Sequence, residues 1–85
     1  MTKKSWYVYI IQTESGKLYT GITTDIETRF KIHKKNKGAK FFRMENPEKI
    51  FVLESYKTRS EASKKEYEIK QLKRNEKLKL LNIDS

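Results

Sequence analysis

The chain has no cysteine, no long apolar run and few acidic residues, and each shortage excludes a class of protein. Without cysteine there is no disulfide scaffold, no thiolate metal site and no cysteine nucleophile. The apolar run Val8–Ile11 is far short of the ~20 residues that cross a bilayer, and no apolar signal stretch follows Lys3 and Lys4. We therefore expect a cytoplasmic protein with no membrane partner.

What remains is a short and strongly basic chain. Its 85 residues suffice for one small domain, which we expect to span residues 1–85. Lys and Arg number 20 against 11 Asp and Glu, which gives a net charge of +9. Six of these cations and no acid lie within residues 31–43. Such a density suits a polyanion, and nucleic acid in particular, although a solubilising charge is the alternative.

The N-terminal residues predict a β-hairpin. Aromatic and β-branched side chains at Trp6–Ile11 and Lys17–Ile22 are typical of strands. Between them, Glu14–Gly16 forms a turn in which Gly16 suits the left-handed last position of a three-residue loop.

The length of this loop fixes how the two strands pair. A three-residue loop places Tyr9 opposite Gly21 and Ile11 opposite Tyr19. Since side chains alternate between the faces of a strand, Tyr9 and Tyr19 then share one face of the sheet. A two-residue loop would put them on opposite faces.

Two helix starts and a third strand follow the hairpin. Thr24–Glu27 and Thr58–Glu61 both match the T-x-x-E capping box, and they predict helices that run to about residues 36 and 74. A basic loop from residue 37 through Pro47 follows the first helix, and Ile50–Leu53 predicts the third strand.

The last element is a short helix with Asn75 as a candidate cap. The predicted fold class is therefore α+β, a small three-stranded antiparallel sheet flanked by helices in the order β-β-α-β-α-α.

Polar residues on the inward faces of the two long helices do not fit a purely structural account. Glu66 shares a stripe with Ala62 and Ile69, and a carboxylate buried there without a partner would cost several kcal/mol. It should meet a cation, a metal or the rim of a cleft, and a structural ion pair stays open. Arg29 and His33 lie one turn apart. A histidine on an inward face is more often a structural group, whereas the guanidinium beside it can bind a phosphate through two hydrogen bonds.

Two phenols, a guanidinium, an imidazole and a carboxylate could thus gather on one face of the sheet: Tyr9, Tyr19, Arg29, His33 and Glu66. In this order they resemble the GIY-YIG nuclease domain, with Tyr7-Val8-Tyr9 and Tyr19-Thr20-Gly21 as its two motifs. Gly38-Ala39-Lys40 is similar to a stretch of the small stand-alone bacterial members, which form an uncharacterised (UPF0213-like) family. The resemblance covers a core of about residues 5–82.

The resemblance implies a divalent-metal-dependent endonuclease that hydrolyses phosphodiester bonds in DNA, either structure-selective or weakly specific. It implies that Tyr9, Tyr19, Arg29, His33 and Glu66 are catalytic, with Glu66 the sole protein ligand of one Mg²⁺ or Mn²⁺ ion. Five cations would hold the nucleic-acid backbone without reading its sequence: Lys34, Lys35, Lys37, Lys40 and Arg43.

Several alternatives stay open. The same scaffold could be a catalytically silent module that binds nucleic acid or a protein partner. We expect a monomer that favours DNA over RNA, with specificity set by the substrate's structure or by a protein partner. Tyr7 and Thr20 depart from the glycine and isoleucine of the two motifs, and a family asparagine could be Asn82 or Asn75.

Overall fold

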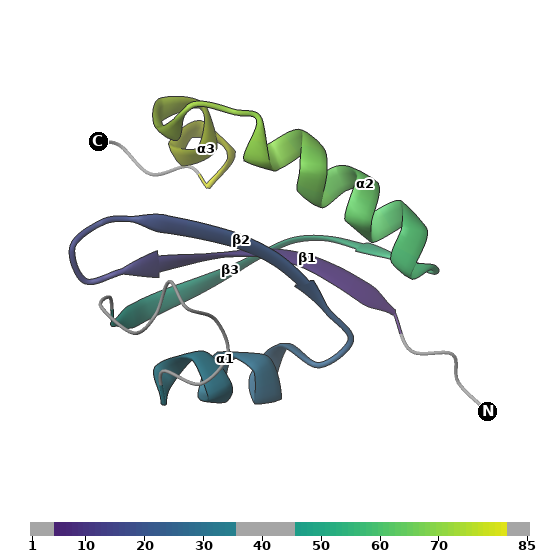
Figure 1. The fold of residues 1–85 in the computed structure, drawn as a ribbon, viewed down its shortest axis with the longest axis horizontal. Coiled ribbons are helices and arrows are strands. Elements are labelled where there is room, and N and C mark those ends of the chain that lie inside the picture. The colour runs from purple at the N-terminus through teal and green to yellow at the C-terminus, as the bar shows by residue number, and fades with distance from the viewer. Residues whose placement is uncertain (1–4, 36–45, 82–85) are drawn as a thin grey trace.

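The computed structural model describes residues 5–35 and 46–81, which form three strands and three helices (Figure 1). The strands are β1 Trp6–Thr13, β2 Leu18–Thr23 and β3 Pro47–Tyr56. The helices are α1 Ile26–Lys34, α2 Arg59–Lys70 and α3 Arg74–Leu80. The element order β1, β2, α1, β3, α2, α3 confirms the predicted α+β class.

The sheet is antiparallel with the strand order β2-β1-β3, so β2 lies at an edge. Tyr9 pairs with Gly21 and Ile11 with Tyr19, as predicted. The predicted loop conformation is also confirmed, because Gly16 has a φ of 92°. The strand pairing therefore puts the two tyrosines on the same face.

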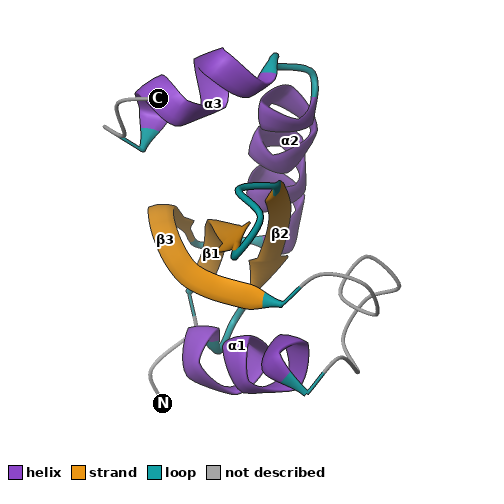
Figure 2. Cartoon of the chain, turned by 90° about the vertical axis from the view of Figure 1, so that its left-hand side faces the viewer, coloured by secondary structure: helices purple, strands orange, loops and turns teal. Residues whose placement is uncertain are grey.

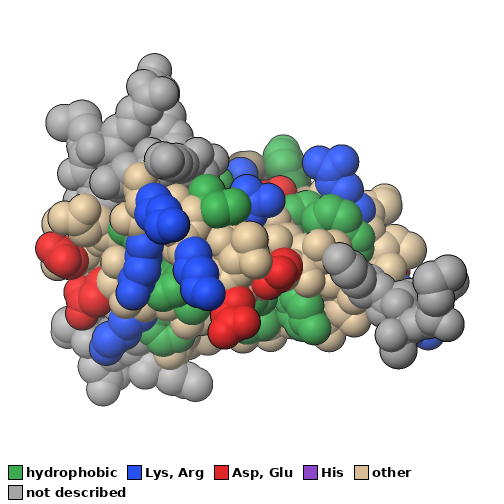
Figure 3. All heavy atoms as spheres, turned by 90° about the horizontal axis from the view of Figure 1, so that it is seen from below, with side chains coloured by type: hydrophobic (Ala, Val, Ile, Leu, Met, Phe, Trp, Pro, Cys, Tyr) green, Lys and Arg blue, Asp and Glu red, His purple; other side chains and the backbone are tan. Residues whose placement is uncertain are grey.

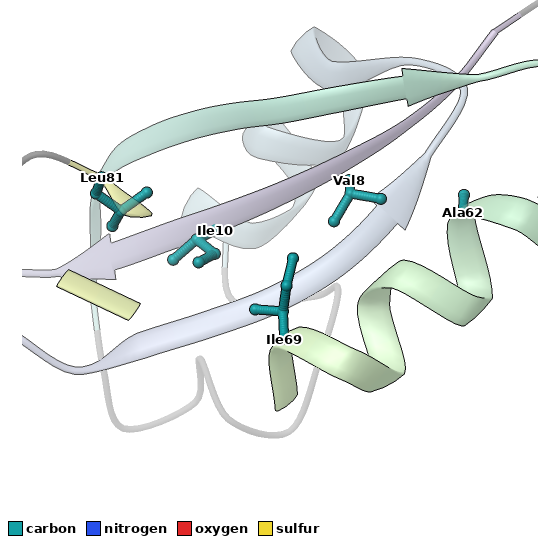
Figure 4. Close-up of a cluster of buried hydrophobic side chains, with 5 residues drawn as sticks. All are labelled: Val8, Ile10, Ala62, Ile69 and Leu81. Carbon is teal, nitrogen blue, oxygen red and sulfur yellow. The ribbon is translucent and has the colours of Figure 1, made fainter. Parts of the chain in front are cut away.

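Helices cover both faces of this sheet. Figure 2 shows α2 and α3 on one side and α1 on the other. The α2 side holds a core of Val8, Ile10, Ala62, Ile69 and Leu81 (Figure 4). The α1 side holds a smaller core, where Tyr9 and Ile11 are buried against Tyr19, Ile26, Phe30 and Ile50. Burial of each large apolar side chain contributes about 1.5–3 kcal/mol, so these two thin layers hold the fold together.

The helix starts agree with the prediction at one helix and differ at the other. Thr58 caps α2 as predicted, since its hydroxyl oxygen accepts the Glu61 N–H at 3.2 Å. The predicted cap at Thr24 is wrong. Asp25 caps α1 instead, because its carboxylate accepts the Thr28 N–H at 3.1 Å and the Thr28 hydroxyl at 2.8 Å. Asp25 is itself held by its N–H bond to the Thr23 hydroxyl at 3.1 Å.

Element ends also differ from the prediction. Helix α2 ends at Lys70, and the chain turns before α3 begins at Arg74, so that the last turns can bury Leu78 and Leu81. Asn75 lies inside α3 and does not cap it. At the N-terminus of α3, the Lys73 N–H donates to the Glu76 carboxylate at 2.9 Å.

Strand β3 is longer than residues 50–53 and includes Pro47, which the sequence assigned to the basic loop. Proline fits there because β3 forms the other edge of the sheet and pairs with β1 only. An edge strand tolerates a residue that has no N–H to donate. Among the described helices, none is both long and apolar enough to pass through a membrane.

Candidate active site

A polar pocket of about 230 Å³ lies at the β2 edge of the sheet. It receives side chains from β1, β2, α1 and α2: Tyr9, Tyr19, Gly21, Ile22, Arg29, Arg59, Ser63 and Glu66. Because α1 and α2 cover opposite faces, their side chains can meet only around an edge strand (Figure 2). The pocket thus brings together four of the five candidate catalytic residues, but not on one face of the sheet as predicted.

Tyr9 reaches this edge by passing over Gly21, its partner on β2. A Cβ atom at Gly21 would lie 2.5 Å from the Tyr9 Oη and 2.7 Å from its Cζ. Real Cβ atoms essentially never approach so closely. The phenol of Tyr9 therefore occupies the space that any other residue at position 21 would fill.

Burial governs the electrostatics of Tyr9, whose residue is 2% exposed. Burial raises the pKa of the Tyr9 hydroxyl above its usual range, the neighbouring Tyr19 and Glu66 raise it further, and Arg29 lowers it. The hydroxyl is consequently protonated at neutral pH. Arg29 alone would lower the pKa of Tyr9, but the effect of desolvation is larger.

Glu66 lies where its helical stripe meets the pocket. Ala62 and Ile69 of the same stripe are fully buried in the core, whereas the Glu66 side chain stays 23% exposed. Its Oε2 lies 3.4 Å from the Nζ of Lys70, one turn along α2. Such i,i+4 pairs near the surface contribute only about 0.3–0.5 kcal/mol. Another cation could therefore replace Lys70 as the partner of Glu66 with little loss of stability.

Arg59 and Ser63 line the pocket and are absent from the sequence-based set. They precede Glu66 by seven and three residues on α2, so one helical stripe carries all three. The guanidinium of Arg59 also lies over the ring of Trp6, 5.8 Å from its centroid. Their spacing from Glu66 was the available signal. This spacing did not point to Arg59, because Arg59 lies inside the capping box Thr58–Glu61 and was interpreted as part of the helix start.

The remaining predicted residues lie elsewhere. His33 belongs to α1, one turn after Arg29, and its side chain is outside the described set. Lys34 and Lys35 are exposed at the end of α1, where Lys34 lies over the Phe30 ring at 4.9 Å. Figure 3, which views the molecule from the α1 side, shows basic side chains gathered on part of that side. Four other predicted positions lie outside the described residues: Lys37, Lys40, Arg43 and Asn82.

Comparison with known proteins agrees with this fold. The family described as the GIY-YIG catalytic domain matches residues 5–79. A UPF0213 protein of Staphylococcus saprophyticus is 43% identical over 89% of this chain and 93% of its own length. Another, of Photorhabdus laumondii, is 45% identical over 95% of this chain and 78% of its own.

A solved structure is similar over nearly the whole chain. It is the solution NMR structure of the UPF0213 protein BH0048 of Bacillus halodurans, with a TM-score of 0.52 and 36% sequence identity. The match covers 92% of this chain and 83% of that protein. With the family match and the curated relatives, this similarity establishes that the chain belongs to the GIY-YIG family, among its UPF0213 members.

Proposed function

We propose that this protein is a divalent-metal-dependent endonuclease that hydrolyses phosphodiester bonds in DNA. The observation that carries the proposal is the pocket at the β2 edge, where Tyr9, Tyr19, Arg29 and Glu66 meet in a chain of the GIY-YIG family. Two guanidinium groups and a carboxylate complement an anionic phosphodiester and a metal cation. The net charge of +9 favours the same polyanionic substrate.

The residues of the pocket fit one Mg²⁺ or Mn²⁺ ion held by Glu66. Mg²⁺ is commonly bound by one or two carboxylates, waters and substrate phosphate oxygens. Glu66 supplies such a carboxylate, partly exposed and paired only weakly with Lys70. Within the described residues no three His, Asp or Glu side chains cluster, which fits a single-carboxylate site. When bound, the ion would stabilise the negative charge that develops on the phosphate and the leaving oxygen.

The arginines would bind the phosphate from two sides. Arg29 comes from α1 and Arg59 from α2, so both faces of the sheet contribute a donor. A donor that acts on developing charge in such a site contributes about 3–4 kcal/mol to transition-state stabilisation. The sequence-based hypothesis assigned this role to Arg29 alone.

The tyrosines would position groups rather than ionise. A protonated Tyr9 hydroxyl can donate to a phosphate oxygen or orient the attacking water, and Tyr19 adjoins it in the pocket. We assign the role of proton acceptor to His33, because imidazole is the side chain that most often transfers protons in catalysis. Tyr9 is assigned a positioning role because its burial keeps the hydroxyl protonated.

Outside the pocket, the basic residues of α1 and the following segment would hold the flanking backbone. Phosphate contacts fix position without reading sequence. We therefore propose that selection rests on the structure of the DNA or on a protein partner, with the enzyme acting as a monomer.

A catalytically silent nucleic-acid-binding module is the second candidate. Two observations favour it: the raised pKa of Tyr9 and the ion pair between Glu66 and Lys70. Both are compatible with a site that binds phosphate without turning it over.

The deciding experiment compares wild type with Glu66→Ala and with Glu68→Ala, a matched change at an exposed position of the same helix. Labelled duplex, flap, junction and single-stranded DNA are incubated in Mg²⁺, Mn²⁺ or EDTA. We expect metal-dependent cleavage by wild type and Glu68→Ala, and none by Glu66→Ala although it still binds DNA. Binding without cleavage by wild type on every substrate would favour the silent module. Equal cleavage by wild type and Glu66→Ala would reject the site.

A further inference from the structure

A second pocket, of about 240 Å³, lies farther along the β2 edge. It is lined by three cations and one apolar residue: Lys17, Leu18, Arg74 and Lys77. The first pocket is lined by Tyr19, Gly21 and Ile22 of the same strand. Helix α2 supplies the outer wall of the first pocket, and α3 supplies that of the second. The two pockets therefore follow one another along a single edge of the sheet.

Arg74 is held in place by the hairpin loop. Its Nη2 donates to the carbonyl oxygen of Gly16 at 2.8 Å, across 58 residues of sequence. A Cβ atom at Gly16 would lie 3.1 Å from the same Nη2, so the loop and the guanidinium fit closely. A guanidinium has five N–H donors in a planar fork, and one bond to Gly16 leaves others for a ligand. The fork is thereby oriented before any ligand binds.

The charge of this pocket selects an anion. Three of its four described lining residues are cations and none is acidic. Lys17 comes from the hairpin, whereas Arg74 and Lys77 come from α3, 57 and 60 residues later, so the fold brings these cations together. None of the three cations belongs to the basic stretch at residues 31–43 of the sequence.

The spacing between the pockets suits a nucleic-acid strand. Leu18 and Gly21 are three residues apart on β2, which corresponds to about 10 Å at ~3.3 Å per residue. The axial rise per nucleotide of a duplex strand is about 3.4 Å, but successive phosphates also wind around the axis and lie roughly 7 Å apart, so the same length covers about one to two nucleotides. We propose that Lys17, Arg74 and Lys77 form a phosphate subsite that binds the substrate backbone about one to two nucleotides from the bond held at Glu66. This inference deepens the proposed function and rests on it.

The test is DNA binding by the double variant Lys17→Gln/Lys77→Gln, measured by fluorescence anisotropy in EDTA over a range of salt. The matched control is Lys49→Gln/Lys79→Gln, which removes the same charge at exposed positions of β3 and α3 that line neither pocket. Urea unfolding of both variants verifies the fold. For duplex DNA we expect the slope of log K against log salt to fall by about 0.9 for the lost phosphate contact. The control should shift it far less.

Oligonucleotide length separates a backbone subsite from a site for free phosphate. The double variant should bind a mononucleotide as wild type does and should lose several-fold in affinity for a twelve-nucleotide strand, roughly the effect of one phosphate contact. Equal slopes for the double variant and its control would overturn the proposal, even if wild type cleaves DNA. An equal loss on the mononucleotide would overturn it in favour of a free-phosphate site. Conversely, the expected pattern without any cleavage would support the subsite and refute the nuclease.

Discussion

Replacing Gly21 with alanine tests whether the position of the Tyr9 hydroxyl matters to the site. The new Cβ would start 2.5 Å from the Tyr9 Oη, so the phenol must move by about 1 Å to reach van der Waals distance. Tyr9 is 2% exposed and packed in the α1-side core, so the ring has little room to yield. Overpacking of this kind destabilises a fold by about 1–3 kcal/mol. A 1 Å displacement at a reacting centre can lower the rate by about 10²-fold.

Two measurements separate these effects. Urea unfolding gives the change in the free energy of unfolding, and single-turnover cleavage at saturating protein gives the rate for the folded fraction. We expect Gly21→Ala to lose about 10²-fold in rate while most of the protein stays folded. In a Tyr9→Phe background the same change should lower the rate much less, because the hydroxyl is already absent. Wild-type rate and stability in Gly21→Ala, or additive losses in the double variant, would refute the reasoning.

Two further predictions concern Arg59 and Tyr56. Arg59→Ala should lower cleavage by about 10²-fold in the single-turnover assay with the fold retained, because the residue is exposed and would supply a phosphate donor; an unchanged rate would remove Arg59 from the site. The Tyr56 hydroxyl donates to the Glu54 carboxylate, which raises the pKa of Tyr56 to about 12. The stabilising bond is present below the ordinary tyrosine pKa of about 10 and is lost as the pH rises through about 12. The spectrophotometric titration of wild type minus that of Tyr56→Phe should show this late ionisation, and a midpoint near the ordinary value would contradict it.

The hairpin was predictable because its determinants are local. Loop length and Gly16 fix the register, and the register alone pairs Tyr9 with Gly21. The end of α2 was not predictable in the same way. The helix-favouring sequence continues past Lys70, but the chain turns there because Leu78 and Leu81 bury against the sheet, which is a tertiary effect.

The candidate site was predictable in composition and not in arrangement. Resemblance named Tyr9, Arg29 and Glu66, but periodicity says only that a helical stripe faces the sheet, not which face of the sheet it covers. Strand order decides that, and β2 became an edge because β3 pairs with β1. The position of Arg59 in the pocket depends on the same strand order. Because α2 lies beside the edge strand β2, its first residue, Arg59, can line the pocket.

An edge position also explains how so small a chain can build a polar pocket. The buried apolar residues form two thin layers, and a polar cavity opened within either layer would remove part of what stabilises the fold. At the β2 edge, Glu66, Arg29 and Arg59 keep contact with solvent, so their desolvation is limited and their replacement leaves both cores intact. Substitutions at these three residues therefore report on binding and chemistry. Tyr9 is the exception, because it belongs to a core and to the pocket at once, and its variants require the stability measurement that the others do not.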